Sequence, residues 1–483
     1  MISFKVLRKA RGRRGQGTGI PGLLTRSLFQ YPPKKIWQGL LLVLIIWSLT
    51  GISGRAAEPP PTLDLKEALR LAFKANPTLQ VSRLQELIAG EDVVRARSGL
   101  LPQLKAEFGQ TIYDNPTKLR FNVPGATGGG PATFPMTNRN FWSSKVYVDQ
   151  LIFDFWATPS RYQAAVQGKQ ASILDTAQTR DNIFLNVCQG YFRTLRAQKM
   201  VVVAQQEVTD LKAHLKIAKD QFEFGVNTYN DVLQAEVNLA DAEQRLIIAN
   251  TDVIDIRSAL NKVLMLPVTA PTVLKDEKLV QPAADLDRAT EEGLRRRSDL
   301  KASQDRIKQQ EWVVTQTRAG YFPRLYAQGG QTWQQNASWL HDTQYFGIFG
   351  LQWTIFSGLD TKAQVAQARD KVGQLLEQHK DLDQQVRLDV QTALLKVKET
   401  AERIRVSEKA VTQGEENLRL NEERYKEQVG TATDVIDAET LLTKTRVSYW
   451  TALYDHQMAK AQLLWAMGGI NELLAEGKGG NAK

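Results

Sequence analysis

The sequence contains few of the residues on which disulfide frameworks, metal sites and nucleophilic catalysis depend. Among its 483 residues there is a single cysteine, Cys188, and there are only four histidines. One cysteine excludes an intrachain disulfide framework and a cysteine-based zinc site. The histidines are scattered without metal-ligand spacing, at His214, His341, His379 and His456. No phosphate-binding loop, His-Glu-x-x-His or Gly-x-Ser-x-Gly motif occurs either. We therefore predict no enzyme, no metal site and no cofactor.

Acidic residues are absent from the first 57 positions. This segment holds ten of the 62 basic residues and none of the 52 acidic residues of the chain. The formal charge of +10 therefore belongs to the N-terminal segment, and the remainder of the chain is balanced. Because no excess of positive charge is left for the folded part, the composition does not indicate a nucleic-acid partner.

Long apolar runs are also missing, except for one at residues 39–49 (GLLLVLIIWSL). Basic residues precede this run and small residues follow it, which is the order found in a secretory signal peptide. A run of about 11 residues is short for a membrane helix, which needs about 20. We predict a signal peptide over residues 1–57, with cleavage near Ala56 or Ala57. Because the basic segment in front is long, two alternatives are open: a start site assigned too far upstream, or an uncleaved inner-membrane anchor.

One half of the chain resembles the other. The pattern from Leu65 to Leu104 recurs 221 residues later, from Leu286 to Leu325. Farther along, the offset falls to 203, as between Phe153 and Phe356. The first copy therefore carries 18 additional residues, around the Pro/Gly-rich segment 124–131, which we expect to be a loop.

A period of this length indicates a duplicated half-molecule rather than a solenoid. We predict a first structural repeat over residues 58–271 and a second over residues 285–470. Residues 272–284 would link the two repeats, and residues 471–483 would form a flexible tail.

Proline is missing from residues 160–266 and from residues 324–483. Since proline in a helix interior costs about 3 kcal/mol, both stretches can form long helices. A helix over residues 160–221 would be ~93 Å long at 1.5 Å per residue. The second stretch carries one apolar stripe at helical spacing, through Leu375, Leu382, Val386, Val390, Ala393, Val397, Ala401, Ile404 and Val411. We predict an elongated bundle or coiled coil of such helices.

Each long helix is interrupted once, at residues 225–228 and 428–431, so we predict two helical hairpins. Gly225 and Gly430 would form the turns. Thr228 with Asp231, and Thr431 with Asp434, have the spacing of capping boxes that open the return helices, with aspartate in place of glutamate.

Four segments have the alternating pattern of strands, at about residues 104–113, 145–153, 325–333 and 346–356. Their apolar and aromatic face resembles the lipid-facing band of an outer-membrane barrel, although Gln150 falls on that face. Four strands cannot close a barrel, so several protomers would have to contribute strands. An ordinary soluble hairpin packed on helices is the alternative.

The whole pattern resembles the TolC-type outer-membrane efflux protein family, also called outer membrane factors. The resemblance covers about residues 62–470. It rests on the duplication, on the Leu-x-x-Ala-Leu-x-x-Ala-x-x-x-Asn-Pro opening at 65–77, on Leu-Pro-x-Leu at 101–104 and on the two hairpin tips. It implies a mainly α protein with a β-barrel part. A homotrimer would form a 12-stranded barrel in outer-membrane lipid, above a long periplasmic coiled-coil tunnel.

The resemblance also implies function and site residues. The protein would be a passive outer-membrane exit duct for a tripartite efflux or type I secretion system, working with a periplasmic adaptor and an inner-membrane pump. Asp434 and Asp437 match the aspartates of the family's pore constriction, although Asp434 could also serve only as a helix cap. Tyr425, Asp231 and Asn230 match the family's gate network. Gly430 stands in place of the gate arginine, and Gln428 in place of a tip glycine.

Two other functions compete with an exit duct. A non-transporting periplasmic coiled-coil scaffold, held by an uncleaved N-terminal anchor, would need no two-faced strands. A hydrolase built on the Asp434 and Asp437 pair would need a third catalytic or ligating group, and the neighbouring sequence offers no histidine. The cargo, whether a drug, a metal ion or a secreted polypeptide, is left open because the pump selects it.

Overall fold

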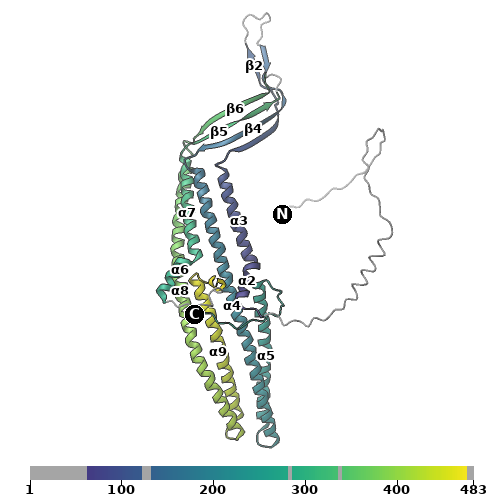
Figure 1. Cartoon of the computed structure of the whole chain (residues 1–483). Helices are drawn as coiled ribbons and strands as arrows, with labels where there is room; N and C mark the ends of the chain where they lie inside the picture. Colours follow the sequence, from purple (N-terminus) through teal and green to yellow (C-terminus); the bar gives the residue numbers. More distant parts are fainter. Residues whose placement is uncertain (1–61, 122–131, 281–284, 336–339, 476–483) are drawn as a thin grey trace, which may run out of the picture. The chain divides into compact units, whose positions relative to one another are not determined.

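The described part of the chain is a mainly helical unit that carries a four-stranded antiparallel sheet and a small two-stranded one (Figure 1). The computed structural model describes residues 62–121, 132–280, 285–335 and 340–475, all within the compact unit from Pro60 to Lys483. The predicted signal peptide, residues 1–57, lies outside these ranges. Within them, no helix is both long and apolar enough to cross a membrane.

The helices repeat along the chain with the two offsets found in the sequence. The first half contains α2 (Leu65–Ala75), α3 (Pro77–Ser98), α4 (Ala157–Glu223) and α5 (Tyr229–Leu264). The second half contains α6 (Leu286–Arg296), α7 (Ser298–Arg318), α8 (Asp360–Lys426) and α9 (Ala432–Ala466). Helices α6 and α7 start 221 residues after α2 and α3, and α8 and α9 start 203 residues after α4 and α5. The predicted internal duplication is confirmed.

Two long helical hairpins dominate the unit. Helices α4 and α8 each contain 67 residues, which at 1.5 Å per residue is roughly 100 Å. Each turns once and returns as α5 or α9. The tips of both hairpins lie at the end of the unit that is away from the sheet, and α9 packs against α4, so the hairpins contact each other (Figure 1).

Helix α8 carries a seam of buried and half-buried residues that follow one another in steps of four and three. This is the 3.5-residue period of a coiled coil. The seam contains Val386, Val390, Ala393, Val397, Thr400, Ile404, Ser407, Val411, Gly414, Leu418, Asn421 and Tyr425. The predicted stripe was wrong at Ala401, which is exposed, because Thr400 is the residue in register. Small residues on the seam let α9 approach closely: a Cβ at Gly414 would lie 3.3 Å from a methyl carbon of Leu442.

The sheet has the strand order β1-β4-β5-β6, and all pairs are antiparallel. Its strands are β1 (Gln103–Ile112), β4 (Asn140–Phe153), β5 (Arg324–Gln334) and β6 (Thr343–Gln352). Strand β4 begins five residues before the predicted 145, because β1 extends far enough to pair with Asn140. Strand β6 ends at 352 rather than 356, because β5 begins at Arg324, opposite Gln352, and offers no partner beyond it.

Both strand-to-helix joints use two consecutive left-handed residues. They are Phe155 and Trp156 before α4, with φ of 51° and 70°, and Gly358 and Leu359 before α8, with φ of 65° and 72°. A non-glycine residue pays roughly 1–2 kcal/mol for this conformation. Phe155 stacks on Phe322, with ring centroids 4.7 Å apart, and this contact offsets part of that cost.

We predicted that the 18-residue insertion is a loop, and this prediction is only partly right. Strands β2 (Lys118–Phe121) and β3 (Ala132–Pro135) flank the Pro/Gly-rich segment and form a separate two-stranded sheet. The rings of Phe121 and Phe134 lie 6.0 Å apart, edge to face. The Pro/Gly-rich residues 124–131 lie outside the described ranges.

The predicted linker and tail both contribute to the core. In the linker, Leu274 and Leu279 are buried, and Leu274 pairs with Leu63 in a single parallel bridge. The predicted tail begins with a short helix, α10 (Glu472–Ala475), in which Glu472 forms a 2.7 Å ion pair with Arg296. The flexible-tail prediction is therefore wrong for residues 471–475, and residues 476–483 lie outside the described ranges.

Candidate functional site

The four-stranded sheet has one apolar face and one polar face. Residues directly opposite each other in the register share a face, as Leu325 does with Leu351 and Ala327 with Phe349. The apolar face comprises Leu104, Phe108, Ile112, Val146, Val148, Leu325, Ala327, Phe349 and Leu351. Several of these side chains are strongly exposed, and Phe349 is 91% exposed. A soluble domain does not leave such a continuous apolar surface uncovered without a partner.

The opposite face is held together by polar contacts. Lys105 donates to the carboxylate of Asp149 at 2.6 Å, and the Tyr147 hydroxyl donates to Glu107 at 2.9 Å. Tyr326 lies so close over Gly350 that a Cβ at that position would collide with its ring. The strand register therefore places the large apolar residues on one face of the sheet and the polar residues on the other.

Gln150 lies on the apolar face, as predicted, opposite Ala327. Its side-chain amide donates to two backbone carbonyls, those of Leu151 at 2.6 Å and Leu100 at 3.3 Å. The register also shifts between Leu151 and Phe153. The amide is thus satisfied by a local irregularity in the strand.

Strands β1 and β6 are the two edges of this sheet, and in the described chain each is paired on one side only. An open edge presents unpaired backbone N–H and C=O groups. Together with the exposed apolar face, the two open edges make a sheet that one chain leaves incomplete.

The two hairpin tips share one backbone geometry. In the first tip, Gly225 has φ of 73°, and in the second its repeat counterpart Gln428 has φ of 64°. Glycine adopts this left-handed conformation freely, whereas glutamine does so at a cost. Gly430 packs closely against Arg424, since a Cβ at Gly430 would lie 3.2 Å from that of Arg424. The second tip therefore keeps the left-handed backbone of the first, although a glutamine occupies that position and the glycine lies two residues later.

The expected capping boxes are present at both return helices. Asp434 accepts a hydrogen bond from the backbone N–H of Thr431 at 2.9 Å, and the Thr431 hydroxyl accepts from the N–H of Asp434 at 3.2 Å. In the first tip, the Asp231 carboxylate accepts from the backbone N–H of Thr228 at 3.2 Å and from its hydroxyl at 3.0 Å. Both aspartates thus start a helix.

Tyr425, the predicted gate tyrosine, connects the two hairpins. It is buried in the last turn of α8, and its hydroxyl accepts a 2.6 Å hydrogen bond from the side-chain amide of Asn227 in the first tip. Asn227 also donates to the side-chain oxygen of Gln221 at 2.6 Å. The ring of His214, on α4, lies 5.2 Å from the ring of Tyr425.

The other predicted gate residues are arranged differently from the expected network. Asp231 makes no hydrogen bond to Tyr425, but its charge adds to burial in raising the pKa of the Tyr425 hydroxyl. Asn230 is exposed, and its side chain has no hydrogen bond in the described part of the chain. The sequence analysis missed Asn227, although it occupies the position that Gly430 holds in the second repeat.

Asp434 and Asp437 are both exposed at the start of α9. The hydrogen bonds from the Thr431 backbone N–H and hydroxyl hold the pKa of Asp434 below its usual value. Asp437 has neither a hydrogen bond nor an ion pair through its side chain in the described residues. Two aspartates of one chain are too few to hold a metal, and no larger cluster of such ligands occurs in the ranges that the structure describes.

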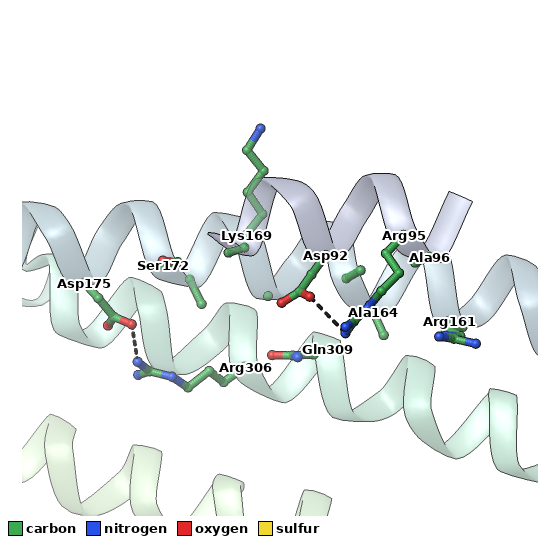
Figure 2. A pocket seen from close by; sticks show the side chains of 14 residues that line it. Asp92, Arg95, Ala96, Arg161, Ala164, Lys169, Ser172, Asp175, Arg306 and Gln309 are labelled. Carbon is green, nitrogen blue, oxygen red and sulfur yellow. Dashed lines mark hydrogen bonds and ion pairs between the residues drawn. The ribbon is translucent and has the colours of Figure 1, made fainter. Parts of the chain in front are cut away.

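A cavity of about 390 Å³ lies between α3, α4 and α7 (Figure 2). Its carboxylates are paired: Asp92 with Arg95 at 2.9 Å, and Asp175 with Arg306. Small side chains such as Ala164 line its floor. Because both acids are neutralised by arginines, the cavity offers no unpaired carboxylate for acid–base chemistry.

Comparison with known proteins supports the family expected from the sequence. The family model described as outer membrane efflux protein matches residues 68–264 and 290–469. The chain is 24% identical over 454 residues to outer membrane protein TolC of Escherichia coli (strain K12), covering 90% of this chain and 87% of that protein.

Solved structures share the fold. CusC matches with a TM-score of 0.73 at 18% identity, over 85% of this chain and 93% of that chain. The Campylobacter jejuni CmeC outer membrane channel matches with a TM-score of 0.72 at 17% identity, over 84% of this chain and 85% of that one. Because the family model spans well over half of the sequence, the chain belongs to the outer membrane efflux protein family, as an outer-membrane export channel that extends into the periplasm.

Proposed function

We propose that three copies of this chain assemble into a passive exit duct, in which each copy contributes four strands to one 12-stranded barrel. The observation that carries this proposal is the incomplete sheet. Strands β1 and β6 are its open edges, and its apolar face is exposed. Lipid cannot satisfy backbone polar groups, so such a sheet must close on itself. Pairing β6 of one copy with β1 of the next closes it.

The helical hairpins would then form the periplasmic tunnel. The tips at Gly225 and Gln428 face the cell interior, and the β2–β3 hairpin lies on the extracellular side, where such barrels carry their longer loops. As membership of the outer membrane efflux protein family suggests, the energy for transport would come from an inner-membrane pump, reached through a periplasmic adaptor. Since the pump selects the cargo, the duct itself serves either efflux or secretion.

The tips would form the narrow end of the tunnel. Three-fold symmetry brings three copies of Asp434 and Asp437 around one axis, which gives a ring of six carboxylates. Their exposure and their place on the first turns of α9 support this role. The contact between Tyr425 and Asn227 holds the two hairpins of each copy together, and Asp231 adds its charge beside it.

Purified protein in planar bilayers tests the duct. We expect an SDS-resistant, heat-labile trimer that conducts ions. A trimer without conductance would favour the periplasmic scaffold, and a species that remains monomeric in detergent and in lipid would contradict the shared barrel.

A further inference from the structure

The two hairpins of one chain contact each other where α4 packs on α9, and this contact contains a carboxyl group without a proper partner. Glu439, on α9, is only 3% exposed. Its Oε2 is one of three buried side-chain atoms in the described residues that have no hydrogen bond. The other carboxyl oxygen, Oε1, accepts only a long 3.4 Å hydrogen bond from Thr443.

The charged groups that act on Glu439 are two acids of α4, Glu207 and Asp210, and one arginine of α9, Arg446. Glu207 is equally buried, and Arg245 of α5 binds it with two hydrogen bonds of 2.9 and 3.2 Å. Asp210 lies 3.9 Å from Arg446 of α9, which also contacts Glu415 of α8 at 3.3 Å. Each arginine is thus engaged by another carboxylate, and within the described ranges Glu439 has no ion pair.

An ionised Glu439 would therefore be a buried charge facing two other negative groups. Burial is the main reason why the pKa of Glu439 rises to about 7, and Asp210 and Glu207 raise it further against the opposing charge of Arg446. Below about pH 7 most copies of the group carry a proton, and a neutral carboxyl is far cheaper to bury than a carboxylate.

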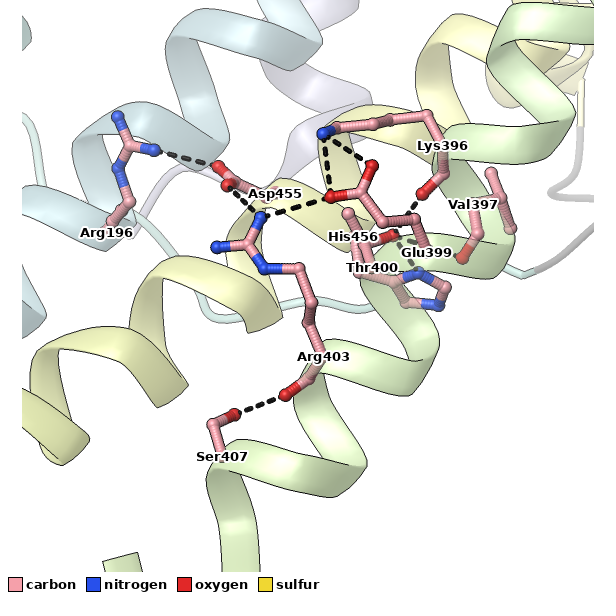
Figure 3. A network of polar contacts seen from close by, with 9 residues as sticks. All are labelled: Arg196, Lys396, Val397, Glu399, Thr400, Arg403, Ser407, Asp455 and His456. Atoms are coloured by element: carbon pink, nitrogen blue, oxygen red, sulfur yellow. Dashed lines mark hydrogen bonds and ion pairs between the residues drawn. The ribbon is translucent and has the colours of Figure 1, made fainter. Parts of the chain in front are cut away.

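Farther along α9, the acid at the same helix interface, Asp455, has ion-pair partners. Asp455 contacts Arg196 of α4 at 2.8 Å and Arg403 of α8 at 3.8 Å (Figure 3). Next to it, the Thr400 hydroxyl and the His456 ring are 2.9 Å apart (Figure 3). The hairpins are thus tied at Asp455 and, at the tips, by the hydrogen bond between Asn227 and Tyr425. Between these two ties, Glu439 is a buried carboxyl group whose charge can change.

We propose that the proton on Glu439 is a switch for the contact between the two hairpins: the protonated side chain keeps α9 on α4, and its ionisation loosens the two helices toward the tips. The direction of this pH effect follows from the thermodynamic coupling between proton binding to Glu439 and the contact of the two helices. A group whose pKa is raised by the contact stabilises that contact at low pH, and this stabilisation is lost as pH rises through about 7. By reciprocity, a partner that pulls the hairpins apart makes Glu439 release its proton.

Spin-label distances on the full-length protein test this switch, which does not depend on the proposed constriction. Labels are placed at Ala213→Cys on α4 and Lys444→Cys on α9, because both positions are exposed. The native Cys188 is fully buried and does not compete. Labelled chains are diluted with unlabelled ones so that only distances within one chain are measured.

We expect one short distance at low pH and a growing longer one as pH rises through about 7. Glu439→Gln, which imitates the protonated form, should keep the short distance at all pH values. Glu408→Gln is the matched control, since Glu408 is an exposed acid of α8, and it should behave as the unmodified protein.

A distance that does not change with pH, or a change that persists in Glu439→Gln, would overturn the proposal. If Glu439→Gln does not fold, infrared titration of the unmodified protein decides. The switch requires the absorption of a buried protonated carboxyl group that disappears over the same pH range as the change in distance, and no such absorption would also overturn it.

Discussion

The side-chain amide of Asn227 donates a 2.6 Å hydrogen bond to the hydroxyl of Tyr425. This bond joins the first hairpin tip to the last turn of α8, 198 residues farther along the chain. Asn227 is itself oriented by Gln221, whose amide also reaches the backbone carbonyl of Tyr425 at 3.5 Å. The tips are therefore connected by neutral hydrogen bonds, where the family resemblance implied a charged arginine at the position of Gly430.

Asn227→Ala should loosen this connection and raise the conductance of the assembled channel. A net contribution of about 1 kcal/mol for one hydrogen bond corresponds to a roughly fivefold change in the ratio of open to closed tips. Tyr425→Phe removes the same acceptor and should have a similar effect. Asn230→Ala is the control, because Asn230 is exposed. Equal conductance of Asn227→Ala and Asn230→Ala would argue against this account of the tips.

His214 should make the same contact sensitive to acid. Burial lowers the pKa of its ring, against the opposing charge of Asp231, and its Nε2 has no hydrogen-bond partner among the described residues. Because the pKa of His214 is lower in the contact than in the unfolded chain, where it is about 6.5, the neutral ring stabilises the contact above that pH. This stabilisation is lost as pH falls. We expect conductance to rise in acid, and His214→Gln to remove this rise. His341→Gln, at an exposed position, should keep it.

The carboxylate ring should select cations and bind multivalent ones, because six negative charges in a narrow space are weakly screened. Multivalent cations added on the periplasmic side should block the current, and Asp434→Asn combined with Asp437→Asn should abolish the block. Asp220→Asn with Glu223→Gln removes the same charge from the exposed end of α4 and should leave the block in place. If both pairs behave alike, Asp434 and Asp437 act only as surface charge and as a helix cap.

Charge on the apolar face of the sheet should prevent membrane insertion. Phe349→Arg places a cation where the side chain is 91% exposed on that face, which costs ~2–4 kcal/mol near the middle of a bilayer. Ile348→Arg is the matched change, since Ile348 is the next residue and lies opposite Gln328 on the polar face. Trimer yield in membrane extracts should fall for Phe349→Arg alone, and equal losses would mean that the lipid face is assigned wrongly.

The helical part of the fold could be predicted closely because its signals are local and occur twice. Proline-free stretches and the two constant offsets locate α4 and α8, whose starting residues differ by the offset of 203. Strand ends were predicted less well, since the end of β6 depends on where β5 begins. Strands β2 and β3 were missed because they are four residues long and adjoin a Pro/Gly-rich segment.

The sites were predictable only in part, for a different reason. The aspartates that cap helices have a fixed spacing from their threonines, so Asp231 and Asp434 were found. Asn227 and Glu439 gain their significance from neighbours on other helices, and no pattern in the nearby sequence marks such contacts.

The most direct test of the central claim is disulfide cross-linking between the two edge strands. Phe108→Cys on β1 is combined in turn with Gly347→Cys, Phe349→Cys or Leu351→Cys on β6, because the register between copies is a further unknown. Within one chain, two strands separate β1 from β6, so at about 4.8 Å per strand the two cysteines are too far apart to bond. A shared barrel predicts covalently closed trimers on non-reducing gels for at least one combination. Oxidation that leaves every combination monomeric, in protein that is folded and inserted in the membrane, would contradict it.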